Sequence, residues 1–571
     1  MTSEGSGVAG GADIVGNGLD PGYSPPAHLS TFPPDLKVWL KGGFVIAKRL
    51  SSAQAAFLPV GFAAGLAWLT TLFPQVGQQP VVERSFFAAA AVLVVGAIAL
   101  FVSATRSGRE LTIEREIKTP HWLQMCAQGA LMLYWGWHVN AVLGNLPLLL
   151  GQLLFAYGFD ALLQWYRRDD YHIGFGPVPI LLSINFFLWF RPEWYYWQFC
   201  IVALGFLAKA FIHWERDGRK RHIFNPSSFP LAVFSLVLIL TGTTDTTYGL
   251  EIAQTLFNPP WIYVAVFLVT LPAQILFGVA TMTIASVVTA YSWGLLYYGA
   301  TGTFFFRDAF IPIAVFLGMH LLFTDPATSP RTEQGRVLYG VSYAVLTIAL
   351  AALLEGVGAP TFYDKLVPIP ILNLMVRRFD AMSTMRVFRE LEPARVLGAL
   401  GVTNTGLATA SLWSMIFVGM LSVGGVGDDH PGQYLPFWAE ACEAENERAC
   451  RTVAQMEGVY CDRGAGWACN ERGILFARTF TDAPAARTDF QRACDLGFTP
   501  GCDNVLRLAT GQGSFAVGSP PIEDLPIVLR GSKGAVTTRD PEELYALGCE
   551  RGWEDMCDPP PAPPRGSSGG P

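Results

Sequence analysis

Charge is scarce in this sequence. Asp, Glu, Lys and Arg make up 15% of the 571 residues, whereas 51% of the residues are hydrophobic. A soluble domain of average composition carries about 25% charged residues, so the shortage argues against an ordinary soluble protein. Many windows of about 20 residues hold one charge or none, which is typical of helices that cross a membrane. The composition therefore predicts a polytopic membrane protein.

Three other features are missing, and each excludes a class. The first residues, Met1-Thr-Ser-Glu-Gly-Ser-Gly, lack the basic and apolar regions of a signal peptide, so insertion is expected to rely on the first membrane helix. No basic cluster is interleaved with aromatic residues, which argues against a nucleic-acid partner. No histidine follows His430, which disfavours zinc as the partner of the late cysteines.

Apolar runs and basic clusters alternate along the chain. Basic clusters fall after an even number of runs, which by the positive-inside tendency puts the N-terminus in the cytoplasm and, after thirteen crossings, the C-terminus outside. The runs 261–281 and 283–299 also fit broken or tilted helices, because Pro272, Gln274 and Gly278 interrupt the first and no charge separates the two. The apolar runs are 56–74, 86–105, 122–141, 144–166, 175–190, 194–214, 228–243, 261–281, 283–299, 306–323, 337–356, 361–376 and 405–425.

The sequence predicts an all-α fold, built as a polytopic membrane helix bundle with an internal repeat and broken helices and followed by extracytoplasmic, disulfide-bonded α-hairpin repeats. We expect it to lie in a bacterial inner (plasma) membrane, with the lipid bilayer as its first partner. The expected divisions are a disordered cytoplasmic arm at 1–38, two extra N-terminal membrane helices at 39–120, a membrane core at 121–380, a linker and last membrane helix at 381–430, cysteine-rich helical repeats at 431–558 and a disordered tail at 559–571.

Two of the apolar stretches are interrupted by proline. The first break is Asn225-Pro226-Ser227-Ser228, and the second is Thr324-Asp325-Pro326, followed by Thr328 and Arg336. A helix does not continue through either, because proline lacks an N–H and disfavours helix in the preceding residue. In lipid, only protein or water satisfies the freed backbone groups, so both breaks are candidate binding sites. The alternatives are a connecting loop with a capping Asp and an Asn-Pro-Ser helix cap.

The two breaks lie about a hundred residues apart and look alike. Such a pair is typical of an internally repeated, transporter-like fold in which half-helix ends meet near a binding site. The positive ends of such half-helices, together with the polar groups of Asn225 and Thr324, are suited to an anionic phosphate or, through their oxygens, to a cation.

At these residues the sequence resembles the membrane-protein family that contains the D subunit of the Rnf electron-transport complex and the B subunit of the sodium-pumping NADH:quinone reductase. The resemblance rests on Phe224-Asn-Pro-Ser-Ser, on Phe323-Thr-Asp-Pro-Ala-Thr-Ser-Pro-Arg-Thr-Glu-Gln-Gly-Arg-Val-Leu-Tyr-Gly340 and on Pro368-Ile-Pro-Ile-Leu-Asn-Leu. It covers roughly residues 140–380.

The resemblance implies an integral membrane subunit of a flavin-dependent electron-transport complex, a translocase in which electron flow can be coupled to cation movement through further electron-transport subunits. It implies FMN or riboflavin as cofactor, held without a covalent bond. The residues that it suggests for cofactor binding are Asn225, Pro226, Ser227, Ser228, Thr324, Asp325, Thr328 and Arg336. Two alternatives stay open: a solute or ion carrier on the same fold without redox chemistry, and a membrane-anchored module for protein interaction.

Eight of the ten cysteines form four pairs with the same spacing. Eight positions along one helix span about 12 Å, too far for a disulfide, so each pair is expected to bridge a turn between two antiparallel helices. Zinc is the competing interpretation, but it usually needs closer cysteines and histidine. Disulfides require an oxidising compartment, such as the periplasm or the cell exterior. The expected pairs are Cys442 with Cys450, Cys461 with Cys469, Cys494 with Cys502, and Cys549 with Cys557.

The phrases around these pairs resemble the Hcp-type cysteine-rich Sel-like repeats, which are helical-hairpin solenoids. Examples are Ala-Cys-Asp-Leu-Gly-Phe-Thr-Pro-Gly-Cys-Asp and Gly-Cys-Glu-Arg-Gly-Trp-Glu-Asp-Met-Cys-Asp. The resemblance implies a module that binds other proteins, here electron-transport subunits or periplasmic proteins. The region from Trp438 onward holds 20 acidic and 13 basic residues, so it carries the whole net charge of −7 (13 − 20 = −7).

A first prediction concerns Thr301. Members of the resembled family that carry covalent FMN attach it through the Thr of an Asp-Gly-x-Ser-x-Ala-Thr loop, whereas Tyr297-Tyr-Gly-Ala-Thr301 lacks the Asp and the Ser. We therefore expect Thr301 to be unmodified and the denatured protein to show no flavin fluorescence in a gel under ultraviolet light. A fluorescent full-length band that disappears in Thr301→Ala would contradict this.

Overall fold

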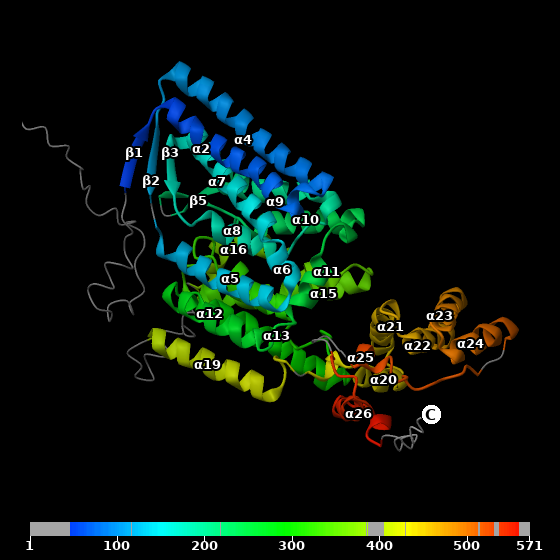
Figure 1. Cartoon of the computed structure of the whole chain (residues 1–571). Helices are drawn as coiled ribbons and strands as arrows, with labels where there is room; N and C mark the ends of the chain where they lie inside the picture. The colour runs from blue at the N-terminus through cyan, green and yellow to red at the C-terminus, as the bar shows by residue number, and fades with distance from the viewer. Residues whose placement is uncertain are drawn as a thin grey trace, which may run out of the picture.

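The computed structural model describes residues 46–558 except 116, 217, 384, 386–404, 429, 512–513 and 530–535. The expected arm at 1–38, the tail at 559–571 and the basic residues Arg386, Arg389 and Arg395 lie outside the described residues. The described part is mostly helical and, as Figure 1 shows, consists of a large helical bundle with a smaller group of helices at one of its ends.

Two long helices precede the core. Strand β1 (Ile46–Leu50) leads into α2 (Ser52–Leu72), whose start is fixed by a capping box between Ser51 and Gln54. After the short α3 (Pro74–Gly77), α4 (Pro80–Ser107) returns along α2 and ends at Gly108, which has a positive φ of 65°. Proline at the first position and glycine just past the end are the residues that favour these boundaries. Both helices pack on α7 of the core.

The first half of the core runs from α5 to α10. Its main helices are α5 (Thr119–His138), α7 (Leu146–Arg168), the short α8 (Pro177–Asn185), α9 (Tyr196–Phe211) and α10 (Ser228–Thr241). Smaller elements connect them, namely β2 (Leu111–Arg115), α6 (Asn140–Gly144), β3 (Asp170–Ile173), η2 (Pro192–Trp194), β4 (His213–Arg216) and β5 (Arg219–His222).

The second half follows η3 (Thr244–Thr246) and α11 (Gly249–Leu256). It contains α12 (Ile262–Leu276), α13 (Ala280–Thr301), α14 (Ile313–Leu317) with the π-helix η4 (Gly318–Leu322), α15 (Glu333–Gly356), η5 (Thr361–Lys365) and α16 (Pro368–Met382). The late helix α19 (Thr405–Val423) packs against α12 and α13, along one side of the bundle in Figure 1. The stretch 261–299 is thus two helices, separated by Gly278, whose φ is 67°.

The connections of the bundle gather at two ends. At the strand end, β1, β2 and β3 form one sheet, with Leu50 opposite Leu111, and β4 pairs with β5. Arg216 joins Asp380 there at 2.6 Å. At the opposite end, which we call the repeat end, the backbone N–H of Trp261 donates to Asp428 at 2.8 Å. Figure 1 shows β1, β2 and β3 on the left and the cysteine-bearing helices on the right.

The described basic clusters follow this division. Arg109 pairs with Asp169, Arg377 donates to the carbonyl of Glu215, and Arg336 donates to the carbonyl of Gly278, all at the strand end. The disulfide-bearing helices lie at the other end. The alternation of basic clusters with apolar runs therefore predicted which connections meet in space.

The two halves of the core repeat one order of elements in opposite directions. Each has two helices of at least 15 residues, then one of at most nine, then two of which the first is the longer, but α5 starts at the strand end and α12 starts at the repeat end. The Asn225 break between α9 and α10 thus corresponds to η5 between α15 and α16, and the break after η4 corresponds to the turn after α8. The two proline breaks are therefore not each other's repeat equivalents, because inverted halves place equivalent breaks at opposite ends.

Five of the described helices are long and apolar enough to cross a membrane: α2, α4, α7, α15 and α19. The helices α9, α10, α12 and the combined α14 and η4 are apolar but shorter. The runs 175–190 and 306–323 do not form continuous helices, since residues beyond α8 and before α14 are irregular. The five strands were not predicted, because they are four or five residues long and lie in polar connections.

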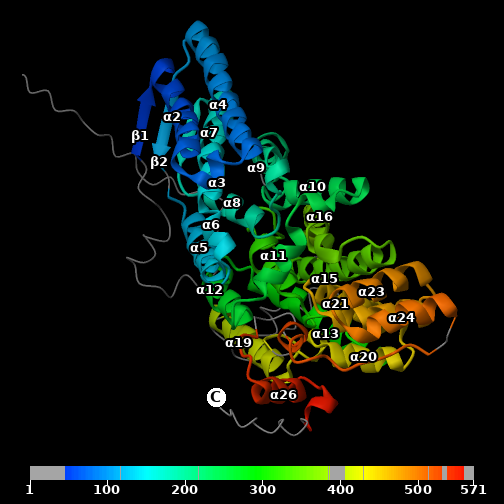
Figure 2. The same cartoon turned by 45° about the vertical axis from the view of Figure 1, so that its right-hand side comes forward.

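Helical hairpins carry the late cysteines. Figure 2 shows α21, α23 and α24 side by side, apart from α2 and α4. The helices are α20 (Leu435–Glu443), α21 (Glu447–Asp462), α22 (Gly466–Arg478), α23 (Ala483–Asp495), α24 (Thr499–Thr510), α25 (Leu525–Val528) and α26 (Pro541–Glu550), with η6 (Pro431–Gln433) before them and the turn η7 (Glu554–Met556) after them.

The four disulfides are those that the spacing predicts. Each of the first three joins the end of one helix to the start of the next, with Cα atoms 4.6 to 4.8 Å apart. The fourth departs from the expected pair of helices, because a 3₁₀ turn, η7, replaces the second helix. The bonds join Cys442 to Cys450, Cys461 to Cys469, Cys494 to Cys502, and Cys549 to Cys557.

Polar and aromatic contacts hold the repeats to the bundle, and the ring of Phe437 stacks on that of Phe304 with centroids 4.5 Å apart. The Arg448 guanidinium pairs with Glu355 at 2.8 Å and donates to the carbonyls of Phe304 and Phe305. Gln433 donates to the carbonyl of Asp308 at 3.0 Å. These contacts fix the repeats to the loop between α13 and α14 and to the end of α15.

A buried carboxyl lies inside the repeats. Glu457 on α21 is 4% exposed, and its Oε2 atom is buried without a hydrogen-bond partner. Burial, and then the neighbouring Glu471, raise the pKa of Glu457 well above its usual value despite Arg472 nearby. Burial also raises the pKa of Glu471 to about 7.

These carboxyls predict that the repeats lose stability as the pH rises. The folded-state pKa values lie above the unfolded ones, so the folded state holds more protons. The free energy of unfolding therefore falls as the pH rises above about 4.3. For each carboxyl it falls by up to roughly 1.4 kcal/mol per pH unit, until the pH passes the folded-state pKa. We expect a lower melting temperature at pH 8 than at pH 5.5, and a weaker pH dependence in Glu457→Gln. The exposed Glu443→Gln is the control; an unchanged dependence in Glu457→Gln would refute this.

Candidate functional site

The two breaks meet at the strand end. Asn225 is 5% exposed, and its amide donates to the carbonyl of Leu322, the last residue of η4, at 3.0 Å. Its Oδ1 accepts hydrogen bonds from the backbone N–H groups of Ser227 and Ser228 at 2.9 and 3.0 Å. Asn225 thus supplies hydrogen-bond partners both to N–H groups in the first turn of α10 and to a carbonyl at the end of η4. Capping residues play this role at helix termini.

Asn373 on α16 binds both breaks. Its Oδ1 accepts the backbone N–H of Asn225 at 3.2 Å, and its Nδ2 donates to the carbonyl of Thr328 and to the hydroxyl of Tyr339. Asn373 is fully buried. It was not among the predicted site residues, although it lies in the Pro368-Ile-Pro-Ile-Leu-Asn stretch that carries part of the resemblance. We call Asn225, Asp325, Thr328 and Asn373 the junction.

Asp325 folds the second break into a tight turn. Its carboxylate accepts from the N–H of Ala327 and the hydroxyl of Thr328, and its carbonyl accepts from Ser329. His222 approaches the carboxylate at 3.7 Å. Burial alone would raise the pKa of Asp325, but His222 and these donors outweigh it and hold the pKa below its usual value. The carboxylate is therefore ionised at neutral pH.

The strand-end arginines are already engaged. Arg336 donates to the carbonyls of Gly278 and Pro330 and pairs with Glu333 at 2.7 Å, so it closes the loop between α12 and α13. Asp380 accepts from Arg216, from the backbone of Arg331 and from Thr332. These pairs hold the second break in place. They also engage Arg216 and Arg336, two cations that a phosphate group would otherwise bind.

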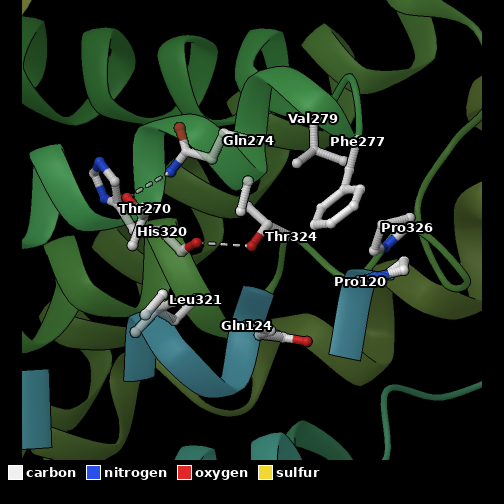
Figure 3. A pocket seen from close by; sticks show the side chains of 12 residues that line it. Pro120, Gln124, Thr270, Gln274, Phe277, Val279, His320, Leu321, Thr324 and Pro326 are labelled. Carbon is white, nitrogen blue, oxygen red and sulfur yellow. Dashed lines mark hydrogen bonds between the residues drawn. The ribbon is translucent and has the colours of Figure 1, made fainter. Parts of the chain in front are cut away.

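A pocket adjoins the second break and is drawn in Figure 3. It encloses about 30 Å³, room for about two water molecules. Figure 3 shows Pro120 and Gln124 of α5 on one side and the α12 residue Gln274 on the other. Thr324 lines it and donates to the carbonyl of His320 at 2.8 Å. We call this the strand-end pocket.

Among the described residues, two buried atoms beside this pocket have no hydrogen-bond partner. They are Nε2 of His320 and Oε1 of Gln274, and both residues are 2% exposed and line the pocket. The other nitrogen of His320 contacts the carbonyl of Phe316 at 2.7 Å, and Nε2 of Gln274 donates to Thr270. His320 belongs to the π-helix η4, an irregularity that often marks functional sites.

The structure separates the residues that the sequence grouped together. Thr324 lines the strand-end pocket, while Asn225, Ser227, Ser228 and Thr328 are buried and bonded beside it. Pro226 follows Asn225, and its carbonyl lies against Gly205 of α9, where an added Cβ would come within 2.4 Å. Thr301 lies elsewhere, at the repeat end of α13, where its hydroxyl donates to the carbonyl of Tyr297 at 2.8 Å.

A second, larger pocket lies near the repeat end. It encloses about 150 Å³ and is lined by the buried amides Gln152, Asn185 and Gln198, without any charged side chain. These amides bond to one another at distances of 2.8 to 3.4 Å. Nothing in the proline pattern pointed to this pocket, because its three buried amides come from α7, α8 and α9.

Comparisons of the chain with protein-family models, with curated proteins and with solved structures find no match. Within the described residues, no group of three His, Cys, Asp or Glu side chains is arranged to hold a metal ion.

The junction predicts a large cost for removing Asn373. Asn373→Leu would leave the N–H of Asn225, the carbonyl of Thr328 and the hydroxyl of Tyr339 without this partner, and each unsatisfied buried group costs about 1–3 kcal/mol. We expect a clear fall in the melting temperature of the detergent-solubilised protein. Ile371→Ala, at an exposed position of the same helix, should change it little. Equal melting temperatures for the wild type and Asn373→Leu would contradict this role.

Proposed function

We propose that the chain is a multi-pass protein of a bacterial inner membrane, with the strand end in the cytoplasm and the disulfide-bonded repeats outside. The basic residues at the strand end support this orientation, because positive charge is retained on the cytoplasmic side. The four disulfides at the other end support an oxidising compartment there. The exposed apolar side chains of α4 and α19 suit contact with lipid.

We further propose that the chain serves a membrane electron-transport complex and holds a flavin without a covalent bond. The observation that carries this is the pair of unpartnered polar atoms that the buried His320 and Gln274 offer at the strand-end pocket beside the junction. At about 30 Å³ the pocket would have to widen to admit a flavin ring. A bound flavin would supply one- and two-electron transfer. The residues of the chain would hold its ring, exclude water and keep the second break in one geometry.

Riboflavin suits this pocket better than FMN. Arg336 and Arg216, the arginines beside the second break, are paired with Glu333 and Asp380, so a phosphate would compete with existing bonds. A neutral flavin needs no such exchange. Electron transfer through further subunits, and its coupling to cation movement, are part of the same proposal.

A solute or ion carrier without redox chemistry is the second candidate. The inverted order of the two core halves supports it, because inverted repeats with broken helices are typical of secondary transporters. A carrier that works by alternating access opens its site to each side of the membrane in turn, and the bundle has a pocket near each end. Whether the purified protein contains flavin distinguishes the electron-transport candidate from the carrier.

The test is the flavin content of the full-length protein purified from a host that makes flavin. We expect flavin absorbance in the wild type, release of riboflavin rather than FMN on denaturation, and reduced content in Gln274→Leu. Gln198→Leu, a buried amide at the other pocket, is the matched control. Asp325→Ala should abolish electron transfer while the protein stays inserted, because the turn of the second break loses its acceptor. A flavin-free wild-type protein would favour the carrier.

A further inference from the structure

The chain crosses the repeats in an extended conformation after α24. Residues 514–520, Ser-Phe-Ala-Val-Gly-Ser-Pro, belong to no helix or strand and lie against α22 and α24. Figure 1 shows the chain returning from the tip of α24 toward α25. The whole connection from α24, which ends at Thr510, to α25, which begins at Leu525, spans 14 residues; connections of roughly this length are uncommon and are usually either functional or linkers.

Two buried asparagines bind the main chain of this segment. Asn504 of α24 accepts the N–H of Ala516 through Oδ1 at 2.6 Å and donates to the carbonyl of Ala516 through Nδ2 at 2.8 Å. Asn470 of α22 donates to the same carbonyl at 3.0 Å and accepts from Asn504 at 2.9 Å. Both asparagines are fully buried. They therefore recognise one residue, Ala516, through its main-chain N–H and carbonyl.

The flanking contacts add a sequence preference. The ring of Phe515 lies 5.3 Å from that of Phe490, and the indole N–H of Trp467 donates to the carbonyl of Gly518. A Cβ on Gly518 would come within 2.9 Å of the Phe498 ring, and the N–H of Gly518 donates to Glu471. Val517, between them, is 66% exposed. The pattern is an aromatic residue, a small residue, any residue and glycine.

We propose that this face of α22 and α24 is a binding groove for an extended peptide of that pattern, and that residues 514–518 occupy it as an internal ligand. A partner protein with an extended aromatic-small-any-glycine segment binds by displacing them. Without an extended chain in the groove, Oδ1 of Asn504 and the indole N–H of Trp467 would lose the partners described here, so the groove needs an occupant. The proposal goes beyond the flavin function and does not depend on it.

The internal ligand has an advantage that a free peptide lacks. A tethered segment acts at an effective concentration in the millimolar range, so an outside peptide at micromolar concentration does not displace it from the wild type. Weakening the tethered segment should therefore open the groove. Ala516→Pro does so, because proline lacks the N–H that Asn504 accepts.

The experiment measures binding of a fluorescent Ser-Phe-Ala-Val-Gly-Ser-Pro peptide to the full-length detergent-solubilised protein by anisotropy. We expect Ala516→Pro to bind at least tenfold more tightly than the wild type. Adding Asn504→Ala to Ala516→Pro should abolish binding. Val517→Pro is the matched control, since Val517 is exposed and the N–H of Ala516 is kept. A peptide with Val in place of Gly should not bind.

Phe515→Ser provides a second opening variant in case Ala516→Pro does not fold, because it removes the ring contact with Phe490 and keeps the backbone pairing site intact. Circular dichroism and intact disulfides establish folding. The proposal is overturned if the peptide binds neither opening variant, or if it binds them equally well with and without Asn504→Ala. None of these measurements depends on flavin content, so either proposal can be disproved without affecting the other.

Discussion

Backbone groups that leave a helix inside an apolar bundle must find partners, and this constraint organises the core. At the strand end, α10 and η4 begin and end next to each other, and buried side chains cap both. Asn225 and Asn373 supply the missing partners. The side-chain amide of Asn225 binds an N–H in the first turn of α10 and the last carbonyl of η4. The side-chain amide of Asn373, on α16, binds the backbone of Asn225 and of Thr328. Neutral amides suit this role because they donate and accept without the desolvation cost of a charge.

The same chemistry recurs in the repeats, outside the bundle. There Asn470 and Asn504 also bind main-chain atoms, although the segment they hold belongs to a connection rather than to a helix end. In the core the bound backbone is buried among helices and has no alternative partner. In the repeats, Val517 is exposed and the bound segment lies at the surface. Buried asparagines thus hold a fixed segment within the core, whereas in the repeats they hold a surface segment that we propose a partner peptide displaces.

The sequence predicted features that depend on local chemistry. The disulfides, such as Cys494 to Cys502, follow from a fixed spacing. The ends of the bundle follow from basic clusters such as Arg216 and Arg336, since charge cannot be buried in lipid without a partner. The proline breaks were placed correctly because proline acts on its own neighbours. That the chain occupies a membrane, and which cofactor it holds, stay predictions.

Other features depend on long-range packing and were missed. Asn373 lies 148 residues after Asn225, and only the fold brings them together. Inversion of the two halves could not be read from the prolines, since the equivalent of the Asn225 break is η5, with a different sequence. The strand-end pocket draws on His320 and Gln274, which look like ordinary members of apolar helices until the π-turn of η4 and the bend at Gly278 are known.

The two ends of the molecule are held by different forces, and this determines how the parts can move. At the strand end, Asp380 pairs with Arg216 of β4 and accepts a hydrogen bond from the backbone of Arg331, so it ties β4 and α16 to the second break. The repeats contact the bundle through Arg448, which pairs with Glu355 and donates to the loop before α14, and through Phe437, whose ring stacks on Phe304 of that loop. That loop leads directly into α14 and η4 and so to the strand-end pocket. The contacts of the repeats and the strand-end pocket are therefore linked along the chain by one short stretch, residues 304–322.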